Sequence, residues 1–152
     1  MKAVAAFLTP EHQRTWTHFT EWSRDTLRTR PEPASDAAAR SEATALLRSL
    51  GAAGHLEAIA VQDLRAVCLL REAVAEASPL ADAIIAIQAL GATPLVRAGT
   101  DEQRARWLSD IIAGRVMTAF AMTEPDAGSD VASMRTSAVR DGSDWILNGG
   151  SI

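Results

Sequence analysis

The chain is short of several residue types, and each shortage excludes a class of protein. Cys68 is its only cysteine, so no disulfide can form within the chain, which fits a reducing compartment. The net charge is −4 and no basic stripe is present, so nucleic-acid binding has little support. No apolar run approaches a membrane-spanning length, and Lys2 to Leu8 is too brief for a secretory signal. We therefore expect a cytoplasmic protein without nucleic-acid or membrane partners.

The remaining composition is that of an ordinary globular protein. Of its 152 residues, 47% are hydrophobic and 22% are charged. A chain of this length can bury one sizeable core, or can form one full domain and the start of another.

Helix signals dominate the first three quarters of the chain. Thr9-Pro10 and Ser35-Asp36 each place a capping hydroxyl at a helix start. Thr100 and Gln103 have the spacing of a capping box. The predicted helices run from Pro10 to the proline-rich break at 30–33, from Ser35 to a left-handed cap at Gly51, from Asp63 to Ala77, from Leu80 to Gly91 and from Thr100 to Gly114. Residues 54–62 are left open between a turn and an extended piece.

The pattern changes near Gly114. Residues 116–122 are short and apolar, which favours a strand. A second strand is predicted over 135–140, and Asp141-Gly142 is a hairpin turn signal before a returning strand at 145–147. The expected fold is mainly α: an N-terminal helical bundle at 1–114, followed by the first antiparallel strands of an incomplete β domain at 115–152.

Several side chains that could carry chemistry are better explained by packing. Cys68 lies in an apolar run and is predicted to be buried. The apolar stretch from Leu80 to Leu90 is interpreted as core, with the lining of a ligand pocket as the alternative. The histidines, which are too scattered to form a ligand set and are expected at helix surfaces or boundaries, are His12, His18 and His55. The tryptophans expected to pack at helical spacing are Trp16, Trp22 and Trp107.

The most informative stretch runs from Phe120 to Asp130. An apolar lead-in is followed by Pro125, which fixes its own φ and restricts the residue before it. Gly128 permits a close approach that a side chain would forbid. These features suit a loop whose amides and hydroxyls face a flat or anionic ligand. The alternative is a plain turn, with Ser129-Asp130 capping whatever follows.

Three acidic residues in and near this loop invite assignment as general bases. Glu124 precedes a proline and is better interpreted as a hydrogen-bond acceptor that fixes the loop. Asp126 and Asp130 are typical turn residues. No residue of this chain is therefore assigned a catalytic role.

The run from Phe120 to Asp130 resembles the flavin-contacting signature of the acyl-CoA dehydrogenase family. Residues 141–149 look like the next hairpin of that family, and 99–114 resembles the segment before the signature. The resemblance implies FAD as the cofactor, and no metal site is expected because the histidines and Cys68 are scattered along the chain. The positions that match FAD-contacting positions of the family are Phe120, Met122, Thr123, Gly128 and Ser129. Ser129 also matches a position that touches the acyl-CoA substrate.

The implied reaction is α,β-desaturation of an acyl-CoA thioester, with hydride transfer to FAD. In the family, the glutamate that removes the α-proton lies far downstream of the signature, so the chain resembles a truncated N-terminal part. Ser151 occupies the position of a usual lysine, and the connection at 52–62 lacks the usual prolines. The expected partners are the acyl-CoA substrate and either a homo-oligomer or a complementing C-terminal segment. The alternatives are an acyl-CoA oxidase or related flavin monooxygenase, and a non-catalytic interaction module or inactive partner subunit of a split dehydrogenase.

Overall fold

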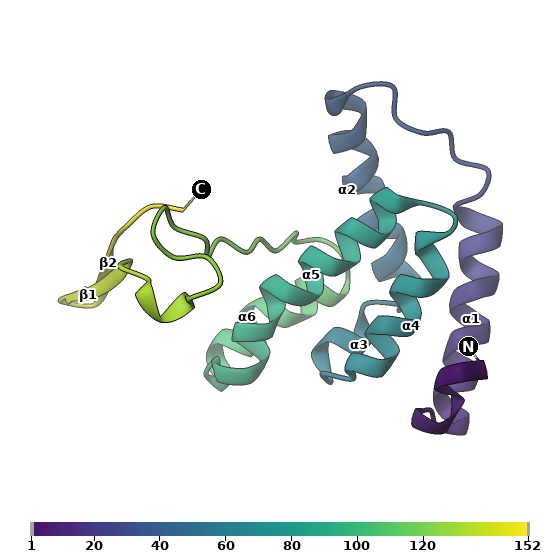
Figure 1. Ribbon diagram of the computed structural model, residues 1–152, viewed down its shortest axis with the longest axis horizontal. Coiled ribbons are helices and arrows are strands. Elements are labelled where there is room, and N and C mark those ends of the chain that lie inside the picture. The colour runs from purple at the N-terminus through teal and green to yellow at the C-terminus, as the bar shows by residue number, and fades with distance from the viewer. Residues whose placement is uncertain (1, 152) are drawn as a thin grey trace. The chain divides into compact units, whose positions relative to one another are not determined.

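The computed structural model describes residues 2–151 and consists of helices followed by one small hairpin (Figure 1). In chain order the elements are η1 (Lys2–Phe7), α1 (Pro10–Thr26), α2 (Asp36–Ala52), α3 (Glu57–Ala60), α4 (Leu64–Ala75), α5 (Pro79–Ala98), α6 (Asp101–Ile112), η2 (Val131–Ser133), β1 (Ser137–Asp141) and β2 (Asp144–Asn148). The predicted fold class, mainly α with antiparallel strands at the end, is confirmed. Two compact units form, one up to Ala119 and one from Phe120. Each unit is described separately below.

The predicted helix starts are made by side-chain caps. The Ser35 hydroxyl accepts a hydrogen bond from the amide of Ala38, and Thr100 and Gln103 form the expected capping box. A second capping box begins α1, where the Thr9 amide donates to Nδ1 of His12 at 3.1 Å. Imidazole here takes the part that Glu or Gln usually plays, so the box was not visible in the sequence pattern.

α5 is much longer than predicted. It runs for 20 residues, through Gly91 and Pro94, to Ala98. The expected end at Gly91 is wrong, because this glycine makes room for a neighbouring segment and caps nothing: a Cβ there would lie 2.7 Å from the Thr118 hydroxyl. α5 is long and apolar enough to cross a membrane. Core helices of globular proteins meet the same criteria of length and composition, so this is weak evidence for a membrane span.

Gly51 was also predicted to cap a helix, and it lies inside α2 instead. A Cβ at Gly51 would collide with the carbonyl group of Ala113, so the residue is small because the end of α6 approaches it closely. The left-handed conformation falls three residues later, at Gly54 with φ +74°. Gly114, with φ +67°, follows α6 where a helix end was predicted.

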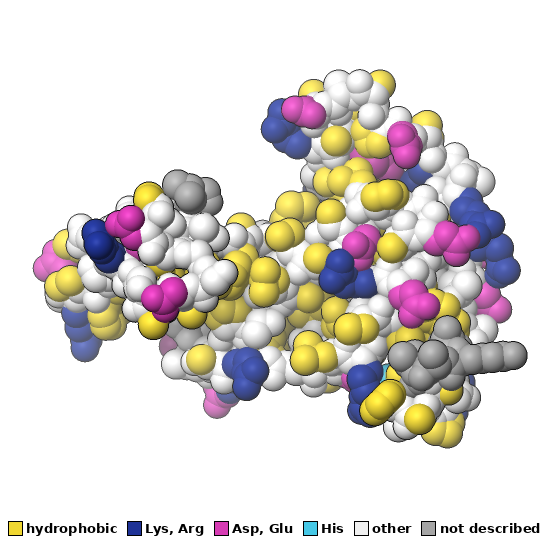
Figure 2. Space-filling view, in the orientation of Figure 1, with side chains coloured by type: hydrophobic (Ala, Val, Ile, Leu, Met, Phe, Trp, Pro, Cys, Tyr) yellow, Lys and Arg dark blue, Asp and Glu magenta, His cyan; other side chains and the backbone are white. Residues whose placement is uncertain are grey.

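The core lies in the helical unit, with α4 and α5 at its centre (Figure 1). α4 packs against α1 and α5, and α5 packs against α2, α4 and α6. The larger apolar residues of this core are Phe19, Leu27, Leu46, Leu47, Leu50, Leu56, Ile59, Val67, Leu69, Leu70, Val74, Ile84, Ile85 and Ile111. The predicted burial of 80–90 holds for one face of α5 only. On its other face Ile87 is 42% and Leu90 45% exposed, and hydrophobic side chains gather over this part of the unit (Figure 2).

Two predictions about single side chains are wrong, those for Cys68 and Trp107. Cys68 is exposed, because α4 turns Val67 and Leu69 toward the core and leaves the residue between them facing solvent. Trp107 does not pack as expected: it is 42% exposed, with the Arg106 guanidinium 4.9 Å from its ring centroid. Trp16 and Trp22 do pack against the core.

The hairpin formed by β1 and β2 confirms the predicted turn. The strands pair antiparallel, from Ser137 opposite Asn148 to Asp141 opposite Asp144. Gly142 has φ +60°, as the first central residue of a type II′ turn requires. Every residue of both strands is exposed. The strand predicted over 116–122 is wrong: the structure assigns no strand there, and the Thr118 amide bonds to a side chain of α5.

Candidate functional site

The signature segment folds into a tight turn in the unit from Phe120 onward. The Glu124 amide donates to the Ala127 carbonyl at 3.0 Å, and the Ala127 amide donates back at 3.1 Å. Pro125 and Asp126 therefore form the tip of the turn, as proline's fixed φ favours.

The Glu124 carboxylate joins this turn to the start of the hairpin. Its two oxygens accept hydrogen bonds from the amides of Arg135, at 2.8 Å, and Thr136, at 2.9 Å, and the residue is only 8% exposed. Hydrogen bonding by the Thr136 side chain and by these two amides lowers the pKa of Glu124. The prediction that Glu124 accepts hydrogen bonds that fix the loop is confirmed. That it does not act as a general base stays a prediction.

A cavity of about 260 Å³ opens beside the turn. Its lining residues are Phe120, Ala121, Met122, Glu124, Met134, Thr136 and Ser151. Ser151 closes one part of it by donating its hydroxyl to the Thr123 carbonyl at 2.9 Å. The cavity thus combines apolar side chains with one carboxylate that is already engaged by the backbone.

The five predicted cofactor-binding residues divide between this cavity and open surface. Phe120 and Met122 line the cavity. Thr123, Gly128 and Ser129 are exposed and do not line it. A Cβ on Gly128 would meet no atom within 4 Å, so the backbone there is open to close approach by another group. All five lie in the same unit.

Replacing Glu124 with Gln is expected to loosen this turn. The neutral amide accepts more weakly than the carboxylate, so we expect hydrogen exchange of the Arg135 and Thr136 amides to become about tenfold faster. Because the folded-state pKa of Glu124 lies below its ordinary 4.5, the same protection in the wild type is present above that value and is lost as the pH falls through the folded-state pKa.

The matched control is Asp126→Asn, which removes an exposed ion pair to Arg135 at 3.3 Å. Exchange of both amides should stay within about twofold of the wild type, since exposed pairs contribute little. Equal acceleration in both variants would show that Glu124 does not hold the turn. Amide exchange measured by NMR at several pH values provides the comparison.

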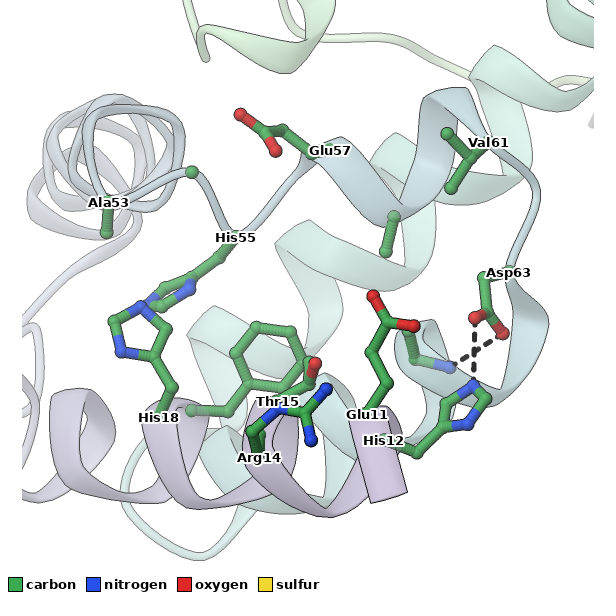
Figure 3. A pocket seen from close by; sticks show the side chains of 14 residues that line it. Glu11, His12, Arg14, Thr15, His18, Ala53, His55, Glu57, Val61 and Asp63 are labelled. Carbon is green, nitrogen blue, oxygen red and sulfur yellow. Dashed lines mark hydrogen bonds and ion pairs between the residues drawn. The ribbon is translucent and has the colours of Figure 1, made fainter. Parts of the chain in front are cut away.

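The helical unit has a second and larger cavity, of about 620 Å³, between α1 and residues 53–66 (Figure 3). At one end His12 bonds through Nε2 to Asp63 at 2.8 Å. Burial by itself would raise the pKa of the Asp63 carboxyl. The hydrogen bonds from the Ala66 amide and the His12 side chain outweigh burial, so the pKa of Asp63 is lowered. This end is a structural link between the start of α1 and the start of α4.

At the other end His18 and His55 lie side by side, with ring centroids 4.9 Å apart (Figure 3). His55 is 1% exposed, and neither of its ring nitrogens has a hydrogen-bond partner within the part of the chain that the structure describes. The rings of Phe19 and Trp22 contact it in T-shaped geometry, with centroids 5.0 Å and 4.6 Å away. Desolvation, and then the charge of His18, lower the pKa of His55 to about 4, so its imidazole is neutral near pH 7.

The sequence did not reveal this arrangement. The predicted surface position holds for His18, and the predicted boundary position holds for His12, at the start of α1, and for His55, just before α3; both boundary histidines are nevertheless buried. The only available signal was the apolar stripe of α1, which supplies the aromatic neighbours of His55. Among the described residues, no group of three or more His, Cys, Asp or Glu side chains could hold a metal ion.

Comparison with known proteins gives the class to which this fold belongs. The model of the acyl-CoA dehydrogenase N-terminal domain matches residues 9–115. The chain therefore belongs to the acyl-CoA dehydrogenase family.

Its relatives are considerably longer. Acyl-CoA dehydrogenase FadE12 of Mycobacterium tuberculosis is 42% identical over 84 residues, which are 55% of this chain and 22% of that protein. The crystal structure of glutaryl-CoA dehydrogenase from Mycobacterium smegmatis superimposes with a TM-score of 0.73 at 28% identity, covering 97% of this chain and 40% of that one. A glutaryl-CoA dehydrogenase from the same organism in complex with FADH2 gives a TM-score of 0.66 at 28% identity, covering 95% and 39%. The chain thus spans less than half of these proteins.

Proposed function

We propose that this chain is the N-terminal part of a flavin-dependent acyl-CoA dehydrogenase that desaturates an acyl-CoA thioester between its α and β carbons. In this proposal residues 1–114 form the helical domain and 115–152 begin the β domain. The proposal is carried by one observation in a chain of this family. Next to the turn held by Glu124, Phe120 and Met122 line the same cavity. FAD, when bound, would accept the hydride that leaves the β carbon.

The residues of the loop fit one side of a flavin. Phe120 and Met122 offer apolar surface, and the exposed Thr123 hydroxyl is free to face a polar ring edge. The open backbone at Gly128 and the exposed Ser129 hydroxyl suit a phosphate or the acyl-CoA thioester. No residue of this segment is proposed to move a proton in the reaction, and no metal takes part.

The exposed face of α5 is proposed to contribute to the acyl pocket. Ile87 and Leu90 are partly exposed apolar residues one turn apart on a helix whose opposite face is core. Exposed apolar side chains on one helix face are typical of a surface that another group covers.

We further propose that the chain acts together with a C-terminal segment or with other copies of itself, in the cytoplasm. The hairpin supports the need for a partner: both of its faces and its edges are exposed, with Trp145 63% and Leu147 73% accessible. A two-stranded hairpin is marginal by itself and gains stability from covering elements. If this segment serves only as an inactive partner subunit, the assembly forms without flavin.

A chimera tests the proposal. Residues 9–149 replace the corresponding part of FadE12, and the purified protein is assayed for the visible absorbance of bound flavin and for acyl-CoA oxidation with an artificial electron acceptor. We expect flavin to be retained and Phe120→Asp to lower its affinity about tenfold or more, because a charge would replace the apolar surface offered to the ring.

Val61→Asp is the matched control, since Val61 is an exposed apolar residue of the helical unit, 75% accessible. It should leave flavin affinity unchanged. A folded chimera of native helix content that holds no flavin would contradict the proposed function. Rapid reoxidation of its reduced flavin in air would instead indicate the oxidase chemistry.

A further inference from the structure

Gln88 is a fully buried polar residue on α5, and all of its side-chain hydrogen bonds go to one distant segment. Its Nε2 donates to the carbonyls of Ile111, at 3.0 Å, and Val116, at 2.8 Å. Its Oε1 accepts from the amide of Thr118 at 2.9 Å. Buried amides need such partners, and here the partners are backbone groups between the end of α6 and the start of the signature segment.

Thr118 binds back to the same turn of α5. Its hydroxyl lies 3.1 Å from the carbonyl oxygens of both Ile87 and Gln88, to which it donates. The segment is thus held through both its main chain and its side chain. Since no strand is assigned at 116–118, the Gln88 side chain supplies bonds that a neighbouring strand would otherwise provide.

Gly91 completes the contact three residues further along α5, on the same face of the helix. A Cβ at Gly91 would lie 2.7 Å from the Cβ and Oγ1 of Thr118 and 2.8 Å from the carbonyl oxygen of Ala119. Only a glycine at position 91 lets residues 118–119 lie this close to the backbone of α5. Gln88 and Gly91 together form a notch on α5 that we call the α5 notch.

We infer that the α5 notch is a positioning device: it fixes the path of residues 116–119 and so the point from which the signature segment begins at Phe120. The inference rests on the proposed function in giving that segment its role in holding FAD. Gln88 and Gly91 touch no cofactor in this account. They act through Thr118 and Ala119, which immediately precede Phe120.

Amide exchange in the full 152-residue chain tests the notch directly. Gln88→Met keeps the length of the side chain and removes all four of its side-chain hydrogen bonds, the fourth being the one that Oε1 accepts from the Thr118 hydroxyl at 3.3 Å. We expect exchange of the Thr118 amide to become about tenfold faster or more, while amides in the middle of α1 and α4 stay within about twofold. Thr93→Val is the control, because it removes a hydroxyl bond to the Ala89 carbonyl within the same helix and contacts none of residues 116–119. A Thr118 amide that stays protected in Gln88→Met would overturn the inference.

Gly91→Ala tests whether the glycine is needed for the contact with Thr118. Alanine has the higher helix propensity, so a glycine without a packing function should give a more stable helix on replacement. We expect the opposite pattern: faster exchange at Thr118, shifted resonances at Thr118 and Ala119, and no gain in melting temperature. A raised melting temperature with Thr118 still protected would show that no notch operates.

Flavin affinity in the FadE12 chimera connects the notch to function. Gln88→Met is expected to weaken FAD binding about tenfold, and the loss of affinity should follow the increase in the exchange rate of the Thr118 amide. Thr93→Val is expected to leave FAD affinity unchanged. Unchanged affinity despite a freed Thr118 would overturn the positioning role while the proposed function stands. If the unmodified chimera binds no flavin, the proposed function fails, and the exchange results by themselves decide whether the notch fixes the segment.

Discussion

Replacing Leu70 with Ala is expected to lower the free energy of unfolding of the helical unit by about 3 kcal/mol, within a range of roughly 2 to 5 kcal/mol. Leu70 lies on α4 and is completely buried in the core between the neighbouring helices. Removing its branched end loses apolar burial and leaves a cavity that the packed helices only partly close. Urea unfolding followed by the far-ultraviolet circular dichroism of the helices measures the change.

Leu64→Ala is the matched control on the same helix. Leu64 is 71% exposed, so its truncation should change the free energy of unfolding by no more than about 0.5 kcal/mol. Similar losses in both variants would mean that α4 does not present the face described here to the core. An unchanged urea dependence in each variant keeps the comparison valid.

Acidification from pH 7 to pH 4 is expected to destabilise the helical unit through His55 by about 3 kcal/mol. The folded-state pKa of His55 is about 4, against an ordinary value of 6.5. Between these two values the unfolded chain binds a proton that the folded chain does not, so stability falls as the pH falls through this window. The physical cause is desolvation of an imidazole enclosed by aromatic rings, reinforced by the neighbouring His18.

His55→Leu isolates this contribution, because leucine fills a similar volume and does not titrate. The variant should be at least as stable as the wild type at neutral pH, since two unbonded ring nitrogens are removed from the interior. Its stability should decline less than that of the wild type between pH 6.5 and pH 4. Carboxylates such as Asp63 titrate in both proteins, so the difference between the two curves reports His55. Parallel curves would contradict the pKa assigned to it.

The sequence predicted those parts of the fold that depend on near neighbours. The caps at Thr9, Ser35 and Thr100 and the turn at Gly142 were found because their hydrogen bonds and φ angles involve residues a few positions apart. The glycines at 51 and 91 were misinterpreted as helix ends. Their small size serves contacts with Ala113 and Thr118, which local pattern does not show.

The candidate site divides in the same way. The turn at Pro125 and the accepting role of Glu124 followed from proline geometry and residue chemistry, and the structure confirms both. The cofactor-binding roles of the loop residues stay predictions. Nothing in the sequence indicates that Gln88 bonds to the segment before the loop, because a buried glutamine within an apolar helix has no visible partner until the chain is folded.

By itself the sequence determined the succession of helices, the change of pattern after Gly114, and the family resemblance of the loop. These follow from periodicity and from side chains close together along the chain. Only the tertiary structure decided that His55 is enclosed with no hydrogen-bond partner among residues 2–151, that Cys68 faces solvent, and that residues 116–118 bond to α5 instead of forming a strand. The reason is that burial and hydrogen-bond partners are set by which helix faces meet, and those faces come from distant parts of the chain.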